Sequence, residues 1–239
     1  MSTNPLILSV ETSGRLGSVA VAIGAQILAE TAFTGQMRHS SEIFPTISSL
    51  LNRFGKKPKH IEHIYISVGP GSFTGLRIAV SIAKIMHLAN TTQIVAVDTL
   101  DVIAANTDDY IKQENIEVEH IAVILDAKRG QFYTAVYQRA AECIWEKISP
   151  DFLITASQFL ERFSGKVDPV WLLGEGLVYY EDKFRADGIR FMDKRFWNPR
   201  AEKVHALGWK MACAGKFADP LTLQPKYLRK PEVTEKRES

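Results

Sequence analysis

The sequence predicts an α/β protein made of two similar lobes that face a cleft. Short apolar runs bounded by glycine-bearing turns are typical of strands, and longer segments place apolar residues at helical spacing. The order of three strands followed by alternating helix and strand occurs twice in the 239 residues. We therefore expect two βββαβα units, one in each half of the chain.

The first half opens with three predicted strands. Apolar runs at residues 6–10 and 18–23 flank a polar turn that contains glycine, and residues 26–33 form the third strand. Apolar residues then recur at helical spacing from Ile43 to Phe54, which predicts a helix capped by a preceding serine. The hydrophobic period thus changes from strand to helix near residue 40.

A glycine-rich turn joins the next strand, residues 64–68, to a helix over residues 76–89, and residues 94–97 complete the half. Free N–H groups at such a turn can bind an anion, whereas the glycines can also let two backbones pass closely. No lysine follows Gly75, so the turn is not a nucleotide-binding P-loop. The predicted structural glycine loop contains Gly69, Gly71, Ser72, Thr74, Gly75 and Arg77.

The second half repeats the order of the first. Its predicted strands are residues 121–125, 131–137, 143–146, 170–173 and 189–192. Its predicted helices are residues 157–163, 176–184 and 202–214. Apolar periodicity fades between residues 104 and 119, where we place the boundary. The predicted division is 1–104 for the N-terminal lobe with its partner helices, 105–230 for the C-terminal lobe and 231–239 for a flexible tail.

Composition limits the possible classes of function. A hydrophobic content of 46%, a charged content of 23% and a net charge of +2 are ordinary for a globular protein and argue against a dominant role in nucleic-acid or membrane binding. Two cysteines far apart indicate a reducing compartment. Without a basic leader or an apolar run of about 18 residues, we expect a cytoplasmic protein.

Two acidic residues, Glu11 and Asp126, occupy corresponding turns of the two opening hairpins. With Thr12 and Ser13 they could hold nucleotide phosphates through Mg²⁺, or they could cap the turns. Bulky Lys128 and a neighbouring arginine stand where a phosphate loop favours small residues. We therefore predict a vestigial nucleotide site and no tightly bound cofactor. The six histidines form no metal signature, so we assign no metal ligand and no catalytic residue.

The helix after the glycine loop is apolar almost all round, since only Arg77, Ser81 and Lys84 form a polar stripe. A surface helix normally keeps more of its circumference polar. Either the preceding helix covers the second apolar side, or a partner protein does. We favour a partner interface that contains Ile43, Phe44, Ile47, Leu51, Ile78, Ile82, Ile85 and Met86.

Several segments together resemble the bacterial TsaB (YeaZ) family over nearly the whole chain. They are residues 7–13, 38–40, 68–77, 126–130 and 227–229, of which 68–77 is the most specific. The resemblance implies two similar lobes of the actin/sugar-kinase/chaperone-ATPase (ASKHA) fold. It also implies a role in tRNA modification, the making of threonylcarbamoyladenosine beside the anticodon.

The resemblance further implies a non-catalytic subunit that forms a heterodimer with the transferase TsaD, joined by the ATPase TsaE, or a homodimer. In TsaD a histidine pair holds a metal, but here His39 is followed four residues later by Ile43. Glu11 stands where nucleotide-binding members have aspartate, so a nucleotide is expected only at a site that a partner completes. tRNA would be reached through the complex, with a possible contribution from Lys226, Arg229 and Lys230.

Two other classes of function stay open. The first is a small-molecule kinase or ATPase of the same fold. The second is a glycoprotease-like metallopeptidase, because relatives have carried a protease label. Binding of MgATP to the isolated chain would favour the former, and bound zinc the latter.

Overall fold

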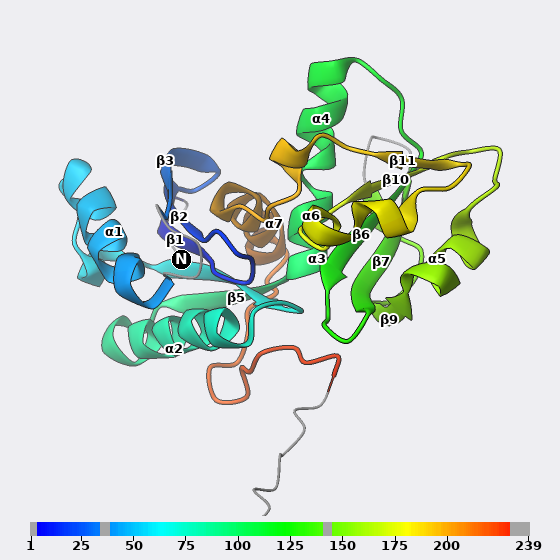
Figure 1. The fold of residues 1–239 in the computed structure, drawn as a ribbon. Helices are drawn as coiled ribbons and strands as arrows, with labels where there is room; N and C mark the ends of the chain where they lie inside the picture. Colours follow the sequence, from blue (N-terminus) through cyan, green and yellow to red (C-terminus); the bar gives the residue numbers. More distant parts are fainter. Residues whose placement is uncertain (1–3, 34–38, 141–144, 230–239) are drawn as a thin grey trace, which may run out of the picture.

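The computed structural model describes residues 4–33, 39–140 and 145–229, and the side chains of residues 39 and 40 are not described. It contains two sheets, one in each lobe (Figure 1). The first sheet has the strand order β3-β2-β1-β4-β5. Its strands are β1 (Leu6–Glu11), β2 (Ser18–Ile23), β3 (Gln26–Ala32), β4 (His63–Gly69) and β5 (Gln93–Asp98).

The second sheet has the order β11-β10-β6-β7-β8, with β9 also paired to β7. Both sheets therefore join an antiparallel hairpin to two parallel strands in the same order. The predicted fold, with its duplicated βββαβα units, is confirmed. The strands are β6 (His120–Asp126), β7 (Gln131–Arg139), β8 (Trp145–Lys147), β9 (Phe152–Thr155), β10 (Val170–Leu173) and β11 (Ile189–Phe191).

Helices cover the sheets and connect them. They are α1 (His39–Arg53), α2 (Phe73–Asn90), α3 (Thr99–Ala104), α4 (Thr107–Glu114), α5 (Ala156–Phe163), α6 (Leu177–Tyr180) and α7 (Ala201–Cys213). Short 3₁₀ turns are η1 (Pro58–His60), η3 (Glu181–Phe184) and η4 (Lys194–Phe196). Helix α2 begins three residues earlier than predicted because Ser72 caps it, its hydroxyl accepting from the Gly75 amide.

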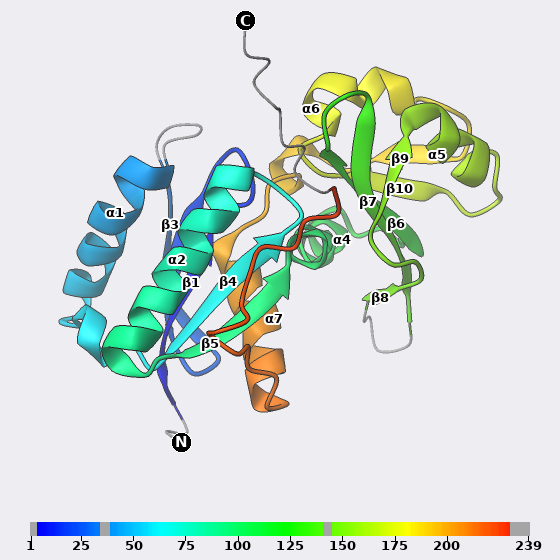
Figure 2. The ribbon, with the colours of Figure 1, turned by 90° about the horizontal axis from the view of Figure 1, so that it is seen from below.

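The first sheet is covered on both faces, as the uninterrupted burial of β1 requires. Leu8 and Ile64 point toward α1 and α2, whereas Ile7 and Tyr65 point toward α7. The figure seen from below shows α1 and α2 side by side along the sheet (Figure 2). Alternating side chains of the same strands thus enter two separate apolar layers.

The C-terminal part of the chain returns to the first lobe. Helix α7, which belongs by sequence to the predicted segment 105–230, packs on β1, β2, β4 and β5. Leu223 is buried in the first core, and the Lys226 amide donates to the Val68 carbonyl at 2.7 Å. The predicted tail, 231–239, lies outside the described residues.

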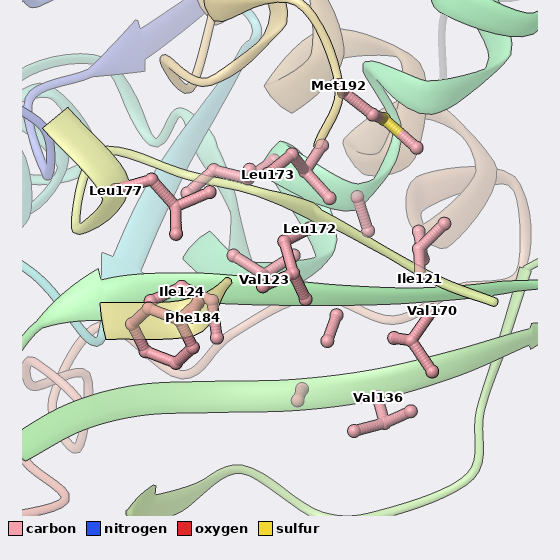
Figure 3. Packing of buried hydrophobic residues seen from close by; sticks show 14 of the residues in the cluster. Ile121, Val123, Ile124, Val136, Val170, Leu172, Leu173, Leu177, Phe184 and Met192 are labelled. Atoms are coloured by element: carbon pink, nitrogen blue, oxygen red, sulfur yellow. The ribbon is translucent and has the colours of Figure 1, made fainter. Parts of the chain in front are cut away.

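The second lobe has its own core between the sheet and helices α5 and α6 (Figure 3). Ile124 of β6, Leu172 of β10 and Phe184 of η3 are all fully enclosed there. Leu100 and Ile103 of α3 join the same core, so the helix that follows the last strand of the first lobe contributes to the second. Each lobe therefore receives a helix from the sequence of the other.

Candidate functional site

The glycine loop packs directly on the turn after β1. A Cβ atom at Gly75 would lie 1.8 Å from the Thr12 carbonyl oxygen, and one at Gly71 would lie 2.6 Å from that of Ser13. The Ser72 amide donates to the Ser13 carbonyl at 2.8 Å, and the Thr12 hydroxyl donates to the Gly75 carbonyl at 2.7 Å. Close backbone approach therefore accounts for both glycines, and the Ser72 amide is engaged within the chain.

Glu11 is fully buried beneath this loop. Its carboxylate accepts from the Ser13 amide and hydroxyl, both at 2.5 Å, and from the Ser67 hydroxyl. Burial raises the pKa of Glu11, and these hydrogen bonds oppose the rise. The side chain thus joins the turn to β4. It does not line the cleft, which contains only Ser13 and Asp126 of the four residues predicted for a vestigial nucleotide site.

The cleft between the lobes has a volume of about 440 Å³. Asp126 lies at its second-lobe wall, where its carboxylate accepts from the Lys128 amide and pairs with the Lys128 ammonium, each at 2.7 Å. Lys128 and Arg129 have left-handed φ values of 64° and 57°, which non-glycine residues seldom adopt. The acid that would coordinate Mg²⁺ is therefore already held by its own turn.

Glu175 is a buried acidic residue of the cleft to which the sequence analysis assigned no role. It is only 8% exposed, and its two carboxylate oxygens both accept from the Arg15 amide at 2.9 Å, across the lobes. Burial, more than any other effect, raises the pKa of Glu175 to about 7. Gly174 places it there, because a Cβ at that position would lie 2.4 Å from the Ile124 carbonyl oxygen. Gly174 and Gly176, which flank Glu175 after a strand, are the sequence feature that points to this residue.

The residues predicted for a partner interface fall into two groups. Ile43, Ile47, Leu51 and Ile82 are buried in the core of the first lobe, and of these four only Ile82 also lines the surface groove described below. Ile78 and Met86 are partly buried against that core. Phe44 and Ile85 are 59% and 60% exposed. Helix α1 thus covers one apolar side of α2, as the alternative interpretation held, and a second apolar side faces solvent.

That second side forms a groove of about 390 Å³ between α1 and α2. Along α2, Ile78, Ile85 and the 81% exposed Leu88 follow one another at intervals of seven and three residues, so they share one face of the helix. We call the groove between the two helices the α1–α2 groove. It is lined by Phe44, Phe73, Thr74, Arg77, Ile78, Ser81, Ile82 and Ile85. Leu88 continues its apolar stripe beyond the groove.

The C-terminal segment reaches the start of α2. The Tyr227 hydroxyl accepts from the Arg77 Nε at 3.1 Å, and its ring lies 5.6 Å from that of Phe73. Lys226 pairs with Asp98 and Asp151, and an Arg229 nitrogen donates to the Ala127 carbonyl at 2.8 Å. Lys226 and Arg229, proposed from sequence as RNA contacts, are thus engaged within the chain, and Lys230 lies outside the described residues.

His63, one of the six histidines, is a buried residue of β4 whose Nδ1 lies 3.2 Å from the Tyr65 hydroxyl. Within residues 4–33, 39–140 and 145–229, no three His, Cys, Asp or Glu side chains are placed to hold a metal ion. No helix in those ranges has the length and apolar character needed to cross a membrane.

Comparison with known proteins places these features in context. The model of the family described as tRNA N6-adenosine threonylcarbamoyltransferase, TsaD, matches residues 26–197. The tRNA threonylcarbamoyladenosine biosynthesis protein TsaB of Bacillus subtilis is 31% identical over 234 residues, 96% of each chain. TsaB of Escherichia coli is 27% identical, over 93% of this chain and 94% of its own.

Two solved structures from Pseudomonas aeruginosa share the fold. One is titled an uncharacterized protein with similarity to peptidase YEAZ and gives a TM-score of 0.79 at 20% identity. The other, titled YeaZ, gives 0.76 at 20% identity. Each alignment covers 94% of this chain and 100% of the other. The overall arrangement of the two lobes is therefore shared with solved proteins.

Proposed function

Since the chain belongs to the TsaB family, and so has a role in making threonylcarbamoyladenosine in tRNA, we propose that it is the non-catalytic subunit that docks on TsaD. The α1–α2 groove is the docking surface of this proposal. We further propose that TsaE joins the pair, that tRNA is reached through the complex, and that the complex is cytoplasmic. In the absence of TsaD the same surface would support a homodimer.

The exposed apolar stripe of α2 is the observation that supports docking. Phe44, Ile85 and Leu88 are each more than half exposed, beside a groove with apolar walls. Contiguous exposed apolar surface of this kind marks interaction sites in monomers. The spacing of the α2 residues suits the packing of a partner helix along it, as in a helical bundle. Burial of each such side chain contributes about 1.5–3 kcal/mol.

The test of docking is size-exclusion chromatography of the chain mixed with TsaD. The double variant Ile85→Asp, Leu88→Asp should keep the circular-dichroism spectrum and melting temperature of the wild type, because both side chains are exposed, and should fail to co-elute. Val167→Asp is the matched control, since Val167 is 98% exposed in the second lobe. Co-elution of the double variant at wild-type strength would contradict the docking surface. Ile47→Asp and Ile82→Asp would test folding instead, because both residues are buried.

The nucleotide part of the proposal concerns the cleft. Because Asp126 is paired with Lys128 and Glu11 is enclosed by hydroxyl groups, the two acids suited to Mg²⁺ are engaged within the chain. We propose that no nucleotide binds tightly to the chain alone, and that any nucleotide site is completed by the partner. Isothermal titration of the isolated chain with MgATP should give no heat of binding. Micromolar affinity that Asp126→Ala abolishes would favour the kinase or ATPase alternative.

A further inference from the structure

Positive charge is concentrated in one short segment that the proposed function does not use. Residues 53–60 contain Arg53, Lys56, Lys57 and Lys59 and no acidic residue. The chain has a net charge of +2, and these four side chains supply four positive charges, so the rest of the chain carries a net charge of −2. We call residues 53–60 the basic turn.

The backbone of the basic turn is held in a defined shape. Gly55 has a left-handed φ of 64°, and the Lys56 and Gly55 amides bond the Leu51 and Asn52 carbonyls at 3.0 Å, which forms a Schellman end to α1. The 3₁₀ turn η1 follows, and the Asn90 side chain at the end of α2 donates to the Pro58 carbonyl at 3.2 Å. The lysines are therefore presented from a fixed support.

The charges of the basic turn have no anionic partner in the described part of the chain. None of the ion pairs there includes Arg53, Lys56, Lys57 or Lys59, and all but the half-buried Lys56 are exposed. The dipole of α1 favours cations at its last turn, which accounts for Arg53 and Lys56. Lys57 and Lys59 lie beyond the helix and gain little from it, because the effect fades within one turn.

The basic turn does not line the α1–α2 groove. Phe44, the groove residue that α1 contributes, is near the start of that helix, and the basic turn begins at its last residue, Arg53. Along α2 the groove extends from Phe73 to Ile85, whereas Asn90, at the end of α2, contacts the basic turn. Both helices end at the same side of the first lobe (Figure 2). A partner in the groove would therefore leave the basic turn open at the edge of the shared surface.

We propose that the basic turn binds the phosphate backbone of the tRNA on which the complex acts. This inference rests on the proposed function, because assembly is what brings a structured RNA to the chain. Several unpaired cations on a rigid support suit closely spaced phosphates, whose neutralisation releases counterions. The modest net charge of the chain is compatible with such a site, since the charge is local. Phe54 is the one aromatic side chain of the segment; it is partly buried and lies beside Arg53, whose Cζ atom is 5.8 Å from its ring centroid, so it offers little surface to a lipid bilayer, which favours RNA over a membrane.

The experiment measures binding of an unmodified tRNA transcript to the complex of this chain with TsaD, by fluorescence anisotropy over a range of salt concentrations. The test variant replaces three lysines of the basic turn by glutamine: Lys56→Gln, Lys57→Gln and Lys59→Gln. The matched control removes equal charge at exposed lysines elsewhere: Lys112→Gln, Lys166→Gln and Lys183→Gln. Each lost phosphate contact should lower the slope of log affinity against log salt by about 0.7–0.9.

We expect the test variant to co-elute with TsaD, to bind tRNA more weakly and to lower that slope by roughly 2 units, with the control unchanged. Equal slopes for the test variant, the control and the wild type would overturn the RNA site while leaving the proposed docking intact. Failure of the wild-type chain to co-elute with TsaD would instead contradict the proposed function, and with it this inference. The two failures are therefore distinguishable.

Discussion

At the scale of single residues, two glutamates beside the cleft differ in what surrounds them. Glu11 accepts hydrogen bonds from two serine hydroxyls and an amide, whereas Glu175 accepts from the backbone amides of Arg15 and Leu16. Arg15 also lies over the Tyr179 ring, with its Cζ atom 4.8 Å from the centroid. Glu175 and Tyr179 therefore hold the Arg15 turn of the first lobe against the second lobe.

The pH dependence of stability should show the cost of ionising Glu175. Its pKa is raised to about 7 in the folded protein, so the folded state binds this proton more tightly than the unfolded state does. The contribution of Glu175 to the free energy of unfolding is favourable at low pH and is lost as pH rises from about 4.5 toward 7. Glu175→Gln should therefore gain stability relative to the wild type between pH 5 and pH 8, by about 1–3 kcal/mol.

Urea unfolding at pH 5 and at pH 8 measures the difference in stability between Glu175→Gln and the wild type. The exposed Glu161→Gln is the control and should give the same difference from the wild type at each pH. A Glu175→Gln difference that does not change with pH would show that the carboxyl group is ionised at little cost.

At the scale of elements, the hydrophobic period predicted most of the structure. Most of the succession of strands and helices in both lobes, including α1 and α2, was predicted from spacing, because each period marks a face that must be buried. The order of the strands within each sheet was not predicted. Helices α3 and α4 were missed at the predicted boundary. α3 follows β5 without a break, and the Asp98 side chain that caps it through the Leu100 amide was not recognised as a start signal.

The hydrophobic pattern also could not show which apolar residues are buried within the chain itself. A helix that is apolar on all sides must be buried on two faces. Residue spacing does not show which face packs on a neighbouring helix of the same chain and which packs on a partner protein. The packing of α1 on α2 decided this for Ile43, Ile47, Leu51 and Ile82. No role was assigned to Glu175 from the sequence for a similar reason, since its role depends on Arg15, 160 residues away in sequence.

The C-terminal segment should stabilise the junction of the lobes through Lys226. Its ammonium pairs with Asp98 of β5 and Asp151 of the second lobe, and burial raises the pKa of Asp98 to about 6. Lys226→Met would remove one of the two cations beside these acids and leave Lys147, which also pairs with Asp98 and Asp151. We expect a loss of about 1–3 kcal/mol at pH 8, because one partner is partly exposed, and a smaller loss at pH 5, where Asp98 is protonated.

Thermal unfolding at the two pH values measures the effect of Lys226→Met. Lys216→Met, at an exposed lysine of the first lobe, should leave stability unchanged at both. Equal losses for Lys226→Met at pH 5 and pH 8 would mean that packing of the lysine stem, and not its charge, joins the segment to the lobes.

At the scale of the whole molecule, the chain consists of two α/β lobes around a cleft of about 440 Å³, and the first lobe exposes one apolar helical face. Phe73 and Thr74 line both the cleft and the α1–α2 groove, so the two sites share a wall. The acids of the cleft are engaged internally, while Phe44, Ile85 and Leu88 are exposed. This distribution favours a role through association over a role through chemistry in the cleft.

The most direct test is formation of threonylcarbamoyladenosine in tRNA by TsaD and TsaE reconstituted with this chain. Modification should require the chain, should be restored by the wild type and by Val167→Asp, and should fail with Ile85→Asp, Leu88→Asp at the same concentration. Addition of the double variant in large excess should recover part of the activity if docking is weakened and not abolished. Full modification by the double variant at wild-type concentration, or without the chain, would contradict a docking role for the α1–α2 groove.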